Sequence, residues 1–124
     1  MGDDAASGLL ATARSLVEAP RPALGGAWPR VAAHLTRQAL EDLLARFWSR
    51  QAPGTEETAL RTQLTCLPYY ADERLAERVA HVWSALSRAC HHQESELLPT
   101  ASELRDWLAA AAELEAQVGG RGRA

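Results

Sequence analysis

Arginine and histidine side chains recur between positions 74 and 92, and this is the part of the chain whose residues best suit chemistry. Apolar residues there recur with helical period, and at 100° per residue His81, Arg88 and His92 fall on one line of that helix. An imidazole can take the proton of a 2′-hydroxyl while a guanidinium holds the phosphate oxygens, with no metal required. We therefore predict Arg88 and His92 as catalytic residues of a phosphodiester reaction. The secondary candidates are His91, His81 and Arg74.

The same residues allow a second interpretation, in which the stripe only covers a solvated helix face. His81 would then lie near Glu77, and His92 near Glu96. Arg88 would reach a carboxylate on a neighbouring helix. His91 points about a quarter-turn away from His92 and is expected at a helix boundary.

Metal binding and cysteine chemistry are further alternatives. His92 and Glu96 at i,i+4 can chelate an ion if the helix persists that far, with Cys90 or His81 as distant ligands, but no second ligand pair is visible. Cys66 and Cys90 are isolated, so we expect two reduced core thiols rather than a disulfide or a nucleophile. The sequence predicts no metal and no cofactor.

Five segments with helical periodicity must position these side chains, and no stretch alternates as a β-strand would. The sequence predicts an all-α fold, a single-domain up-down bundle of four to five helices. Helices are expected near 5–18, 28–51 and 55–67, from 73 onward, and near 101–118. The helix from 73 has a core face of Leu75, Val79, Val82, Leu86 and Cys90. The bundle spans 5–118, between an N-terminal tail at 1–4 and a disordered C-terminal tail at 119–124.

Capping residues indicate where the helices begin. The predicted N-caps are Asp4, Thr55 and Asp72, and Thr100 with Glu103 forms a capping box. Pro29 suits a first helical position, because its fixed φ and missing N–H are tolerated there. The segment 21–26 is expected to be a loop.

Four tryptophans offer rings for stacking on nucleic-acid bases or for packing. They are Trp28, Trp48, Trp83 and Trp107. In a bundle of this size, tryptophans more often fill the junctions between helices, so we expect packing.

Composition limits how the chain can meet other molecules. A formal net charge of -3 argues against a whole-surface electrostatic grip on nucleic acid but leaves a local basic stripe open. All thirteen basic residues are Arg, as the codon bias of a GC-rich bacterial genome would give. No stretch approaches the roughly 20 apolar residues of a membrane span. Asp3 and Asp4 stand where a signal peptide carries positive charge, so we expect a cytoplasmic protein without membrane contact.

Two stretches carry a likeness to a known family. Residues 33–44 (AHLTRQALEDLL) and 83–92 (WSALSRACHH) resemble, respectively, an early helix and a later Arg- and His-bearing helix of the HEPN superfamily. These small helical bundles occur in prokaryotic toxin–antitoxin and defence systems and in RNA-processing enzymes. In catalytic members four to six residues separate the Arg and the His, and two subunits form a composite, metal-independent ribonuclease site. Here three residues lie between Arg88 and His92, and six between Arg74 and His81.

The resemblance implies a HEPN-like homodimer that cleaves RNA without a metal, or binds RNA or a nucleotide, in a bacterial defence or toxin–antitoxin type system. Some relatives are not catalytic. The alternative hypothesis is therefore a non-enzymatic module for dimerisation or for binding a protein partner. The two hypotheses differ in whether Arg88 and His92 lie in a shared cleft or on an open convex surface.

Overall fold

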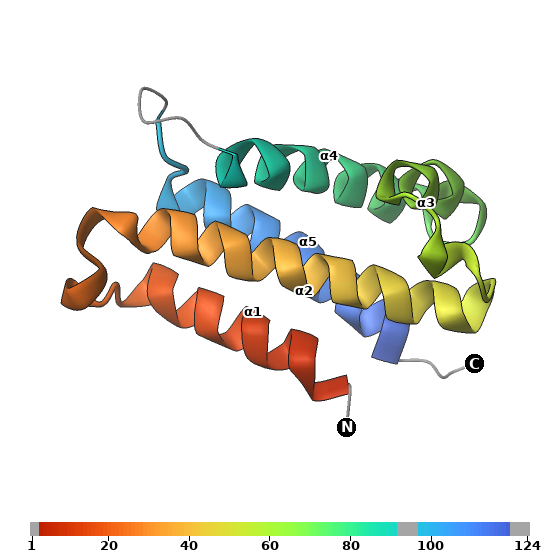
Figure 1. Ribbon diagram of the computed structural model, residues 1–124, viewed down its shortest axis with the longest axis horizontal. Helices are drawn as coiled ribbons and strands as arrows, with labels where there is room; N and C mark the ends of the chain where they lie inside the picture. The colour runs from red at the N-terminus through yellow and green to blue at the C-terminus, as the bar shows by residue number, and fades with distance from the viewer. Residues whose placement is uncertain (1–2, 92–96, 120–124) are drawn as a thin grey trace.

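Four long helices form the bundle in the computed structural model, which describes residues 3–91 and 97–119. They are α1 (Asp3–Glu18), α2 (Trp28–Gln51), α4 (Glu73–Cys90) and α5 (Ala101–Gly119). Successive long helices run in opposite directions (Figure 1), and the short α3 (Leu60–Cys66) packs against α4. The described residues contain no strand, so the prediction of an all-α up-down bundle is confirmed.

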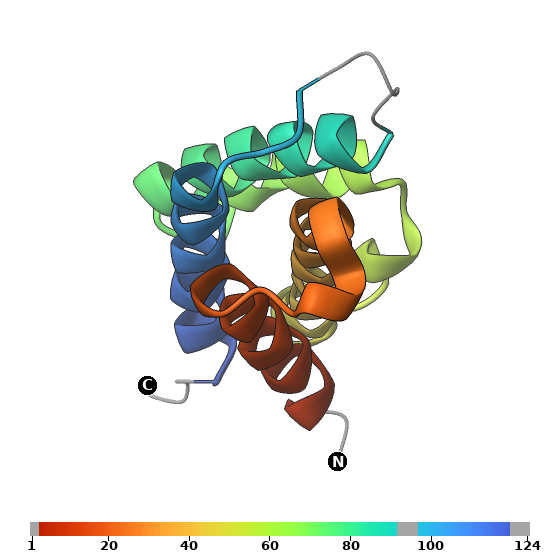
Figure 2. The ribbon, with the colours of Figure 1, turned by 90° about the vertical axis from the view of Figure 1, so that its left-hand side faces the viewer.

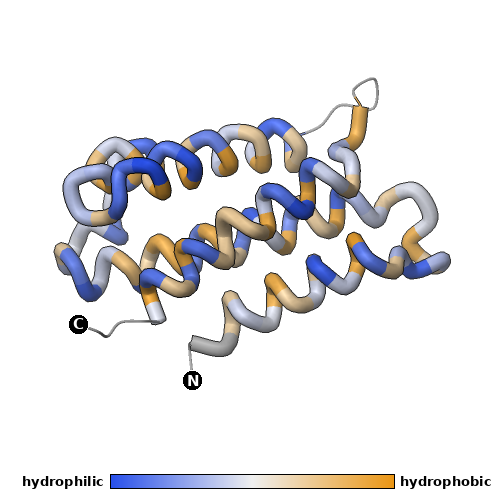
Figure 3. The backbone as a smooth tube through the Cα atoms, turned by 180° about the vertical axis from the view of Figure 1, so that it is seen from behind, coloured by the Kyte–Doolittle hydropathy of each residue, from blue (hydrophilic) through white to orange (hydrophobic). Residues whose placement is uncertain are grey.

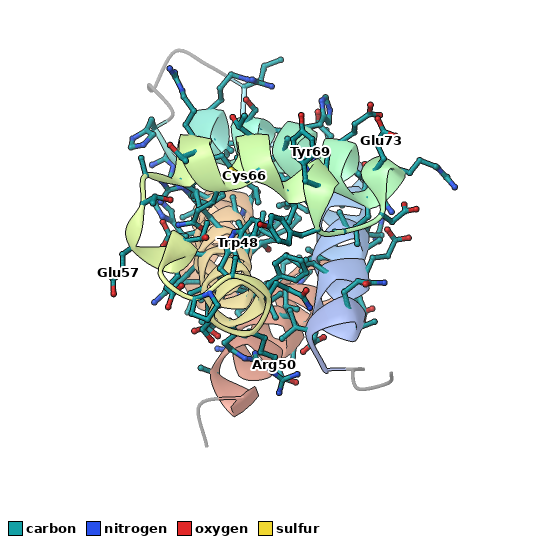
Figure 4. The ribbon with its side chains drawn as sticks, turned by 90° about the vertical axis from the view of Figure 1, so that its right-hand side faces the viewer. Trp48, Arg50, Glu57, Cys66, Tyr69 and Glu73 are labelled. Carbon is teal, nitrogen blue, oxygen red and sulfur yellow. The ribbon has the colours of Figure 1, made fainter. Side chains whose placement is uncertain are left out.

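α2 and α5 each pack against the other three long helices. The view in Figure 2 shows the four long helices arranged around a shared interior. Leu40, Leu43, Leu44 and Trp48 of α2 are fully buried there. Figure 4 shows Trp48 inside the bundle and Glu57 directed away from it. The predicted packing role of the tryptophans holds: Trp48 and Trp107 are buried, and Trp28 and Trp83 are partly buried against the core.

The inner face of α4 follows the predicted periodicity. Leu75, Val79, Val82 and Leu86 are all buried. Figure 3 shows the hydrophobic positions of α4 on the side that faces the bundle. Cys90, the last predicted member of this face, is only partly buried because the helix ends there. One face of α4 thus packs against the core, and its opposite face is exposed to solvent.

Two of the predicted helix starts are confirmed by their hydrogen bonds. An Asp72 carboxylate oxygen accepts from the Leu75 backbone N–H at 3.0 Å. The Thr100 hydroxyl accepts from the Glu103 N–H at 3.0 Å, and the Glu103 carboxylate accepts from the Thr100 N–H at 2.9 Å. Both devices satisfy amide groups that the first helical turn leaves without a partner.

The other two predicted caps are wrong. Asp4 lies inside α1, because that helix already begins at Asp3. Thr55 begins a 3-10 turn, η2 (Thr55–Glu57), and does not cap α3, which starts at Leu60. The Thr55 carbonyl accepts from both the Thr58 N–H and the Thr58 hydroxyl, so the chain turns there before the helix can start.

The connections and ends also differ from prediction. The expected loop at 21–26 contains a 3-10 helix, η1 (Pro22–Ala27), with Gly25 at a φ of 53°. A side chain is strained at that positive φ, so glycine allows the kink inside η1. Gly119 belongs to α5 and not to a tail, and Asp3 belongs to α1, while residues 120–124 lie outside the described part of the chain.

Polar contacts link α5 to α2 and to α4. The Arg50 guanidinium at the end of α2 donates to the Val118 carbonyl in the last turn of α5 at 2.8 Å, and Figure 4 shows Arg50 on that side of the bundle. Arg78 of α4 pairs with Asp106 at 3.2 Å and with Glu113 at 3.0 Å, both on α5. The Arg78 pairs link α4 to α5, whereas the buried face of α4 sets which side of that helix faces outward.

Candidate functional site

The outward side of α4 carries most of the residues that the sequence singled out. The α4 stripe consists of Arg74, His81, Arg88 and His91, and each of these four residues is exposed. Positions that differ by three, four or seven residues share a helix face, which is why the four lie along one side. His91 is the C-cap residue of α4, as its predicted place at a helix boundary requires.

The structure places the candidate catalytic pairs unequally. Arg88 lies on the exposed side of the last turn of α4, whereas His92 lies outside the described residues. His91, three residues after Arg88, is therefore the described imidazole nearest to it along the helix. Arg74 and His81 are both exposed on one face of α4 and lie two turns apart, about 10.5 Å along the axis.

The metal alternative needed a helix that continues to Glu96. α4 ends at Cys90, and the ligands proposed for that site, His92 and Glu96, lie outside the described residues. Within 3–91 and 97–119, no three His, Cys, Asp or Glu side chains gather closely enough to hold a metal ion. The described part of the chain therefore presents no metal centre to consider.

The arginine of α4 that reaches carboxylates on a neighbouring helix is Arg78. It pairs with Asp106 and Glu113 of α5. No hydrogen bond or ion pair joins Arg88 or His81 to another residue within the described ranges. Arg88 thus presents its charge to solvent, while the charge of Arg78 is neutralised locally.

A groove lies between α3 and α4 beside the α4 stripe. Its volume is about 530 Å³, and it is lined by Arg61, Leu64, Thr65, Ala80, Trp83, Ser84 and Ser87. Figure 4 shows α3 lying in front of α4 at this end of the bundle. Ser84 lies three residues after His81 and four before Arg88, so the groove follows the edge of the stripe. We refer to it as the α3–α4 groove.

The lining of the α3–α4 groove contains no carboxylate. It offers one guanidinium, three hydroxyls and one indole. The Thr65 hydroxyl donates to the Arg61 carbonyl at 2.9 Å, which leaves its oxygen as an acceptor. The Ser84 and Ser87 hydroxyls make no hydrogen bond to described residues, so both can donate to or accept from a ligand. This combination suits an anionic ligand that also carries a flat apolar group.

A second groove, between the start of α4 and the end of α5, has a different character. It is lined by Asp72, Arg74, Leu75, Arg78, Glu113, Ala116 and Gln117, with a volume of about 460 Å³. Carboxylates and guanidiniums are mixed there, and Arg78 is already paired with Glu113. An anion would have to compete with those carboxylates, so this groove fits an anionic ligand less well.

Trp83 is held in the α3–α4 groove by a residue of another helix. The guanidinium carbon of Arg37 on α2 lies 4.6 Å from the centre of the Trp83 ring, within the range of a cation–π contact. Arg37 also forms an i,i+4 pair with Glu41 at 4.0 Å. The Arg37 Nε is buried and has no hydrogen-bond partner among the described residues. Arg37 is thus committed to the Trp83 ring.

Cys90 lies near this cluster and is not activated as a nucleophile. Burial raises the pKa of the Cys90 thiol; Arg37 lowers that pKa in part and Glu41 raises it further. A thiol with a raised pKa is protonated at neutral pH and reacts slowly. Cys66 and Cys90 are both free thiols, and both are only partly buried rather than enclosed in the core as predicted.

Sequence reasoning found the α4 stripe but missed the groove beside it. Ser84 and Ser87 were visible in the sequence, because both lie within one turn of Arg88. Arg61 gave no such signal, since its position depends on how α3 packs against α4. The contact between Arg37 and Trp83 joins two helices and is likewise invisible to periodicity.

Comparison with models of protein families, with curated proteins and with solved structures found no match. None of the described helices is long and apolar enough to cross a membrane.

Proposed function

We propose that this chain is an RNA-binding helical protein whose binding surface is the α3–α4 groove. One observation carries the proposal: Arg61 and three hydroxyls meet in a groove without a carboxylate, beside the exposed His81 and Arg88. Arginine is well suited to phosphate, because its planar guanidinium can hold two oxygens at once. Arg61 lines the groove on the α3 side, and the exposed Arg88 lies next to its α4 edge, four residues after Ser84, so a phosphate backbone that enters the groove from this edge would meet both cations.

The negative net charge shapes how such binding would behave. With a formal charge of -3, attraction of RNA is local to the groove and has no support from the rest of the surface. Two phosphate contacts on a single strand would give a slope of about -1.4 for the logarithm of the affinity against that of the salt concentration. Binding of this kind is weak at physiological salt and is best measured at low salt.

The proposal also includes the finer hypotheses drawn from the sequence. We propose a HEPN-like protein of the cytoplasm that acts as a homodimer, in which two copies bring two α4 stripes to one RNA. Arg88 supplies a guanidinium, and His91 or His92 supplies an imidazole for proton transfer. Cleavage by such a site would leave 2′,3′-cyclic phosphate ends and would continue in EDTA.

The test is fluorescence anisotropy of a labelled RNA at low salt, in EDTA, with charge-reversal variants at matched exposed arginines. Arg61→Glu and Arg88→Glu are each expected to weaken binding by about tenfold or more, because a hydrogen bond to a charged group contributes about 1.5–3 kcal/mol. Arg105→Glu on α5 makes the same change of charge away from the groove and should have a much smaller effect. Equal losses in all three variants, or no binding by the wild type, would overturn the proposal.

Two further measurements on the same samples test the finer hypotheses. Gel analysis of the RNA after incubation shows whether it is cleaved, and Arg88→Ala with His91→Ala and His92→Ala assigns any cleavage to the stripe. Light scattering over a wide concentration range tests the homodimer. Binding without cleavage supports the RNA-binding protein and removes the ribonuclease, and a monomer at all concentrations removes the composite site.

One observation favours the alternative of a protein-interaction module. Tyr69 is 84% exposed and Tyr70 is 48% exposed, both in the connection between α3 and α4. Figure 4 shows Tyr69 near that connection. Exposed tyrosines are common where proteins meet. If the wild type binds no RNA, Tyr69→Ser compared with Thr62→Ser in a binding assay against candidate protein partners is the next measurement.

A further inference from the structure

We infer that the α3–α4 groove recognises an unpaired nucleobase, which stacks on Trp83, and that the protein therefore selects single-stranded over duplex RNA. This inference rests on the proposed RNA binding and deepens it. It assigns to Trp83 a role in addition to its packing against the core.

The Trp83 ring is the surface on which a base would stack. Trp83 is only partly buried, and it lines the groove. Arg37 covers the ring at 4.6 Å from its centre but is not among the residues that line the groove. Trp83 therefore contacts Arg37 and also contributes to the groove lining, and the proposed stacking uses the part of the indole that meets the groove.

Neighbouring residues restrain the Trp83 side chain. Arg37 contacts the ring and pairs with Glu41 at 4.0 Å, and Trp83 lies three residues before the buried Leu86 on α4. A stacking partner that is already held in place loses little conformational freedom when the ligand binds. The cation behind the ring also keeps the indole oriented when the groove is empty.

The rest of the α3–α4 groove has a size and composition that suit a nucleotide. Its volume of about 530 Å³ is within the range of about 300–1,000 Å³ typical of small-molecule sites. Leu64 and Ala80 provide apolar walls for a base, and Arg61 provides a cation for its phosphate. Ser84 and Ser87 can each donate or accept, so they can meet the edge of any base without selecting one strongly.

Duplex RNA is not the preferred ligand of a site that stacks on a base. In an A-form helix the bases are stacked on one another and their faces are not accessible, so a ring can stack only on an unpaired base. Stacking on aromatic rings tolerates any base, because every base has a flat face. The groove is thus suited to an unpaired base of no fixed identity, with its phosphate at Arg61.

The experiment compares three ligands and four proteins by anisotropy in EDTA at low salt. The ligands are a single-stranded RNA, its blunt duplex, and the same single strand with abasic sites. The proteins are the wild type, Trp83→Phe, Trp83→Leu and Arg61→Glu. We expect the wild type to prefer the single strand to the duplex and to the abasic strand by about tenfold. We expect Trp83→Leu to lose that preference and Trp83→Phe to keep most of it.

The outcomes separate this inference from the function on which it rests. If Arg61→Glu weakens binding but the wild type binds all three ligands equally, the base-stacking inference is wrong and the RNA-binding proposal stands. If the wild type binds none of the ligands, the RNA-binding proposal itself fails. The abasic strand tests stacking without changing the protein, so a Trp83→Leu variant that does not fold leaves the inference open to refutation.

Discussion

The contact between Arg37 and Trp83 makes a prediction whose size follows from the structure. The guanidinium carbon lies 4.6 Å from the ring centre, well inside the limit of about 6 Å for a cation–π contact. The Arg37 side chain is 30% exposed, so its value should lie between that of an exposed pair, about 0.5–1 kcal/mol, and that of a desolvated pair, about 2 kcal/mol. We expect a coupling of about 1 kcal/mol.

A double-mutant cycle measures this coupling directly. Arg37→Met keeps an unbranched apolar chain and removes the charge, Trp83→Leu removes the ring, and the double variant closes the cycle. Urea denaturation gives the free energy of unfolding of each protein. In a chain of this size a loss of 1 kcal/mol corresponds to a fall in Tm of about 4 °C.

The ion pair between Arg37 and Glu41 must be separated from the ring contact. Glu41→Gln removes the pair, which is partly exposed, and should cost no more than about 0.5 kcal/mol. The reasoning is refuted if the coupling between Arg37→Met and Trp83→Leu is below about 0.3 kcal/mol, the usual error of additivity. It is also refuted if Glu41→Gln costs as much as Arg37→Met, because the ion pair would then account for the whole effect.

Three further predictions concern the elements that hold α4 and α5. Thr100→Ala removes the capping-box hydroxyl and should lower the free energy of unfolding by about 1 kcal/mol in urea denaturation. Leu86→Ala leaves a cavity under α4 and should cost about 2–5 kcal/mol, whereas Leu97→Ala, at a side chain 96% exposed, should change stability by less than about 0.5 kcal/mol. The pKa of Cys90 is raised from 9.0, so the fold favours the neutral thiol. Iodoacetamide should therefore modify Cys90 more slowly at pH 8 in the folded protein than in the urea-unfolded chain. The stability that Cys90 contributes should decline as the pH rises above 9.

The parts of the fold that could be predicted are those set by residues close in sequence. The Asp72 cap and the Thr100–Glu103 box depend on hydrogen bonds across three residues, and both form as predicted. The core face of α4 depends only on helical period and is correct for its buried members. Thr55 does not cap α3, because its backbone carbonyl accepts hydrogen bonds from the Thr58 N–H and hydroxyl and so closes a local turn.

The candidate site was only half visible for the same physical reason. Periodicity placed Arg74, His81 and Arg88 on one side of α4, because those positions repeat every two turns. The α3–α4 groove needs Arg61 from a helix that precedes α4, and Trp83 is oriented by Arg37 from α2. No spacing rule connects residues on three separate helices. The pairing of Arg88 with His92 stays a prediction, since His92 lies outside the described residues.

The distribution of charge along α4 decides where an anion can bind more than net charge does. The first half of α4 carries Glu73 and Glu77, and its Arg78 is neutralised by carboxylates of α5. From residue 81 to residue 90 the helix has no carboxylate at all. The C-terminal end of a helix carries partial negative charge, which Arg88 in the last turn offsets.

The partial negative charge at the end of α4 makes the arginines contribute unequally to phosphate binding at the proposed site. Part of the charge of Arg88 compensates the helix end, whereas Arg61 on α3 lies within the groove lining itself and faces no carboxylate there. A phosphate should therefore bind nearer Arg61 than Arg88, and Arg61→Glu should weaken RNA binding more than Arg88→Glu. Arg74→Glu should weaken it least, because Arg74 stands among carboxylates at the other end of α4. The reverse order in anisotropy measurements would place the RNA along the outer stripe and not in the groove.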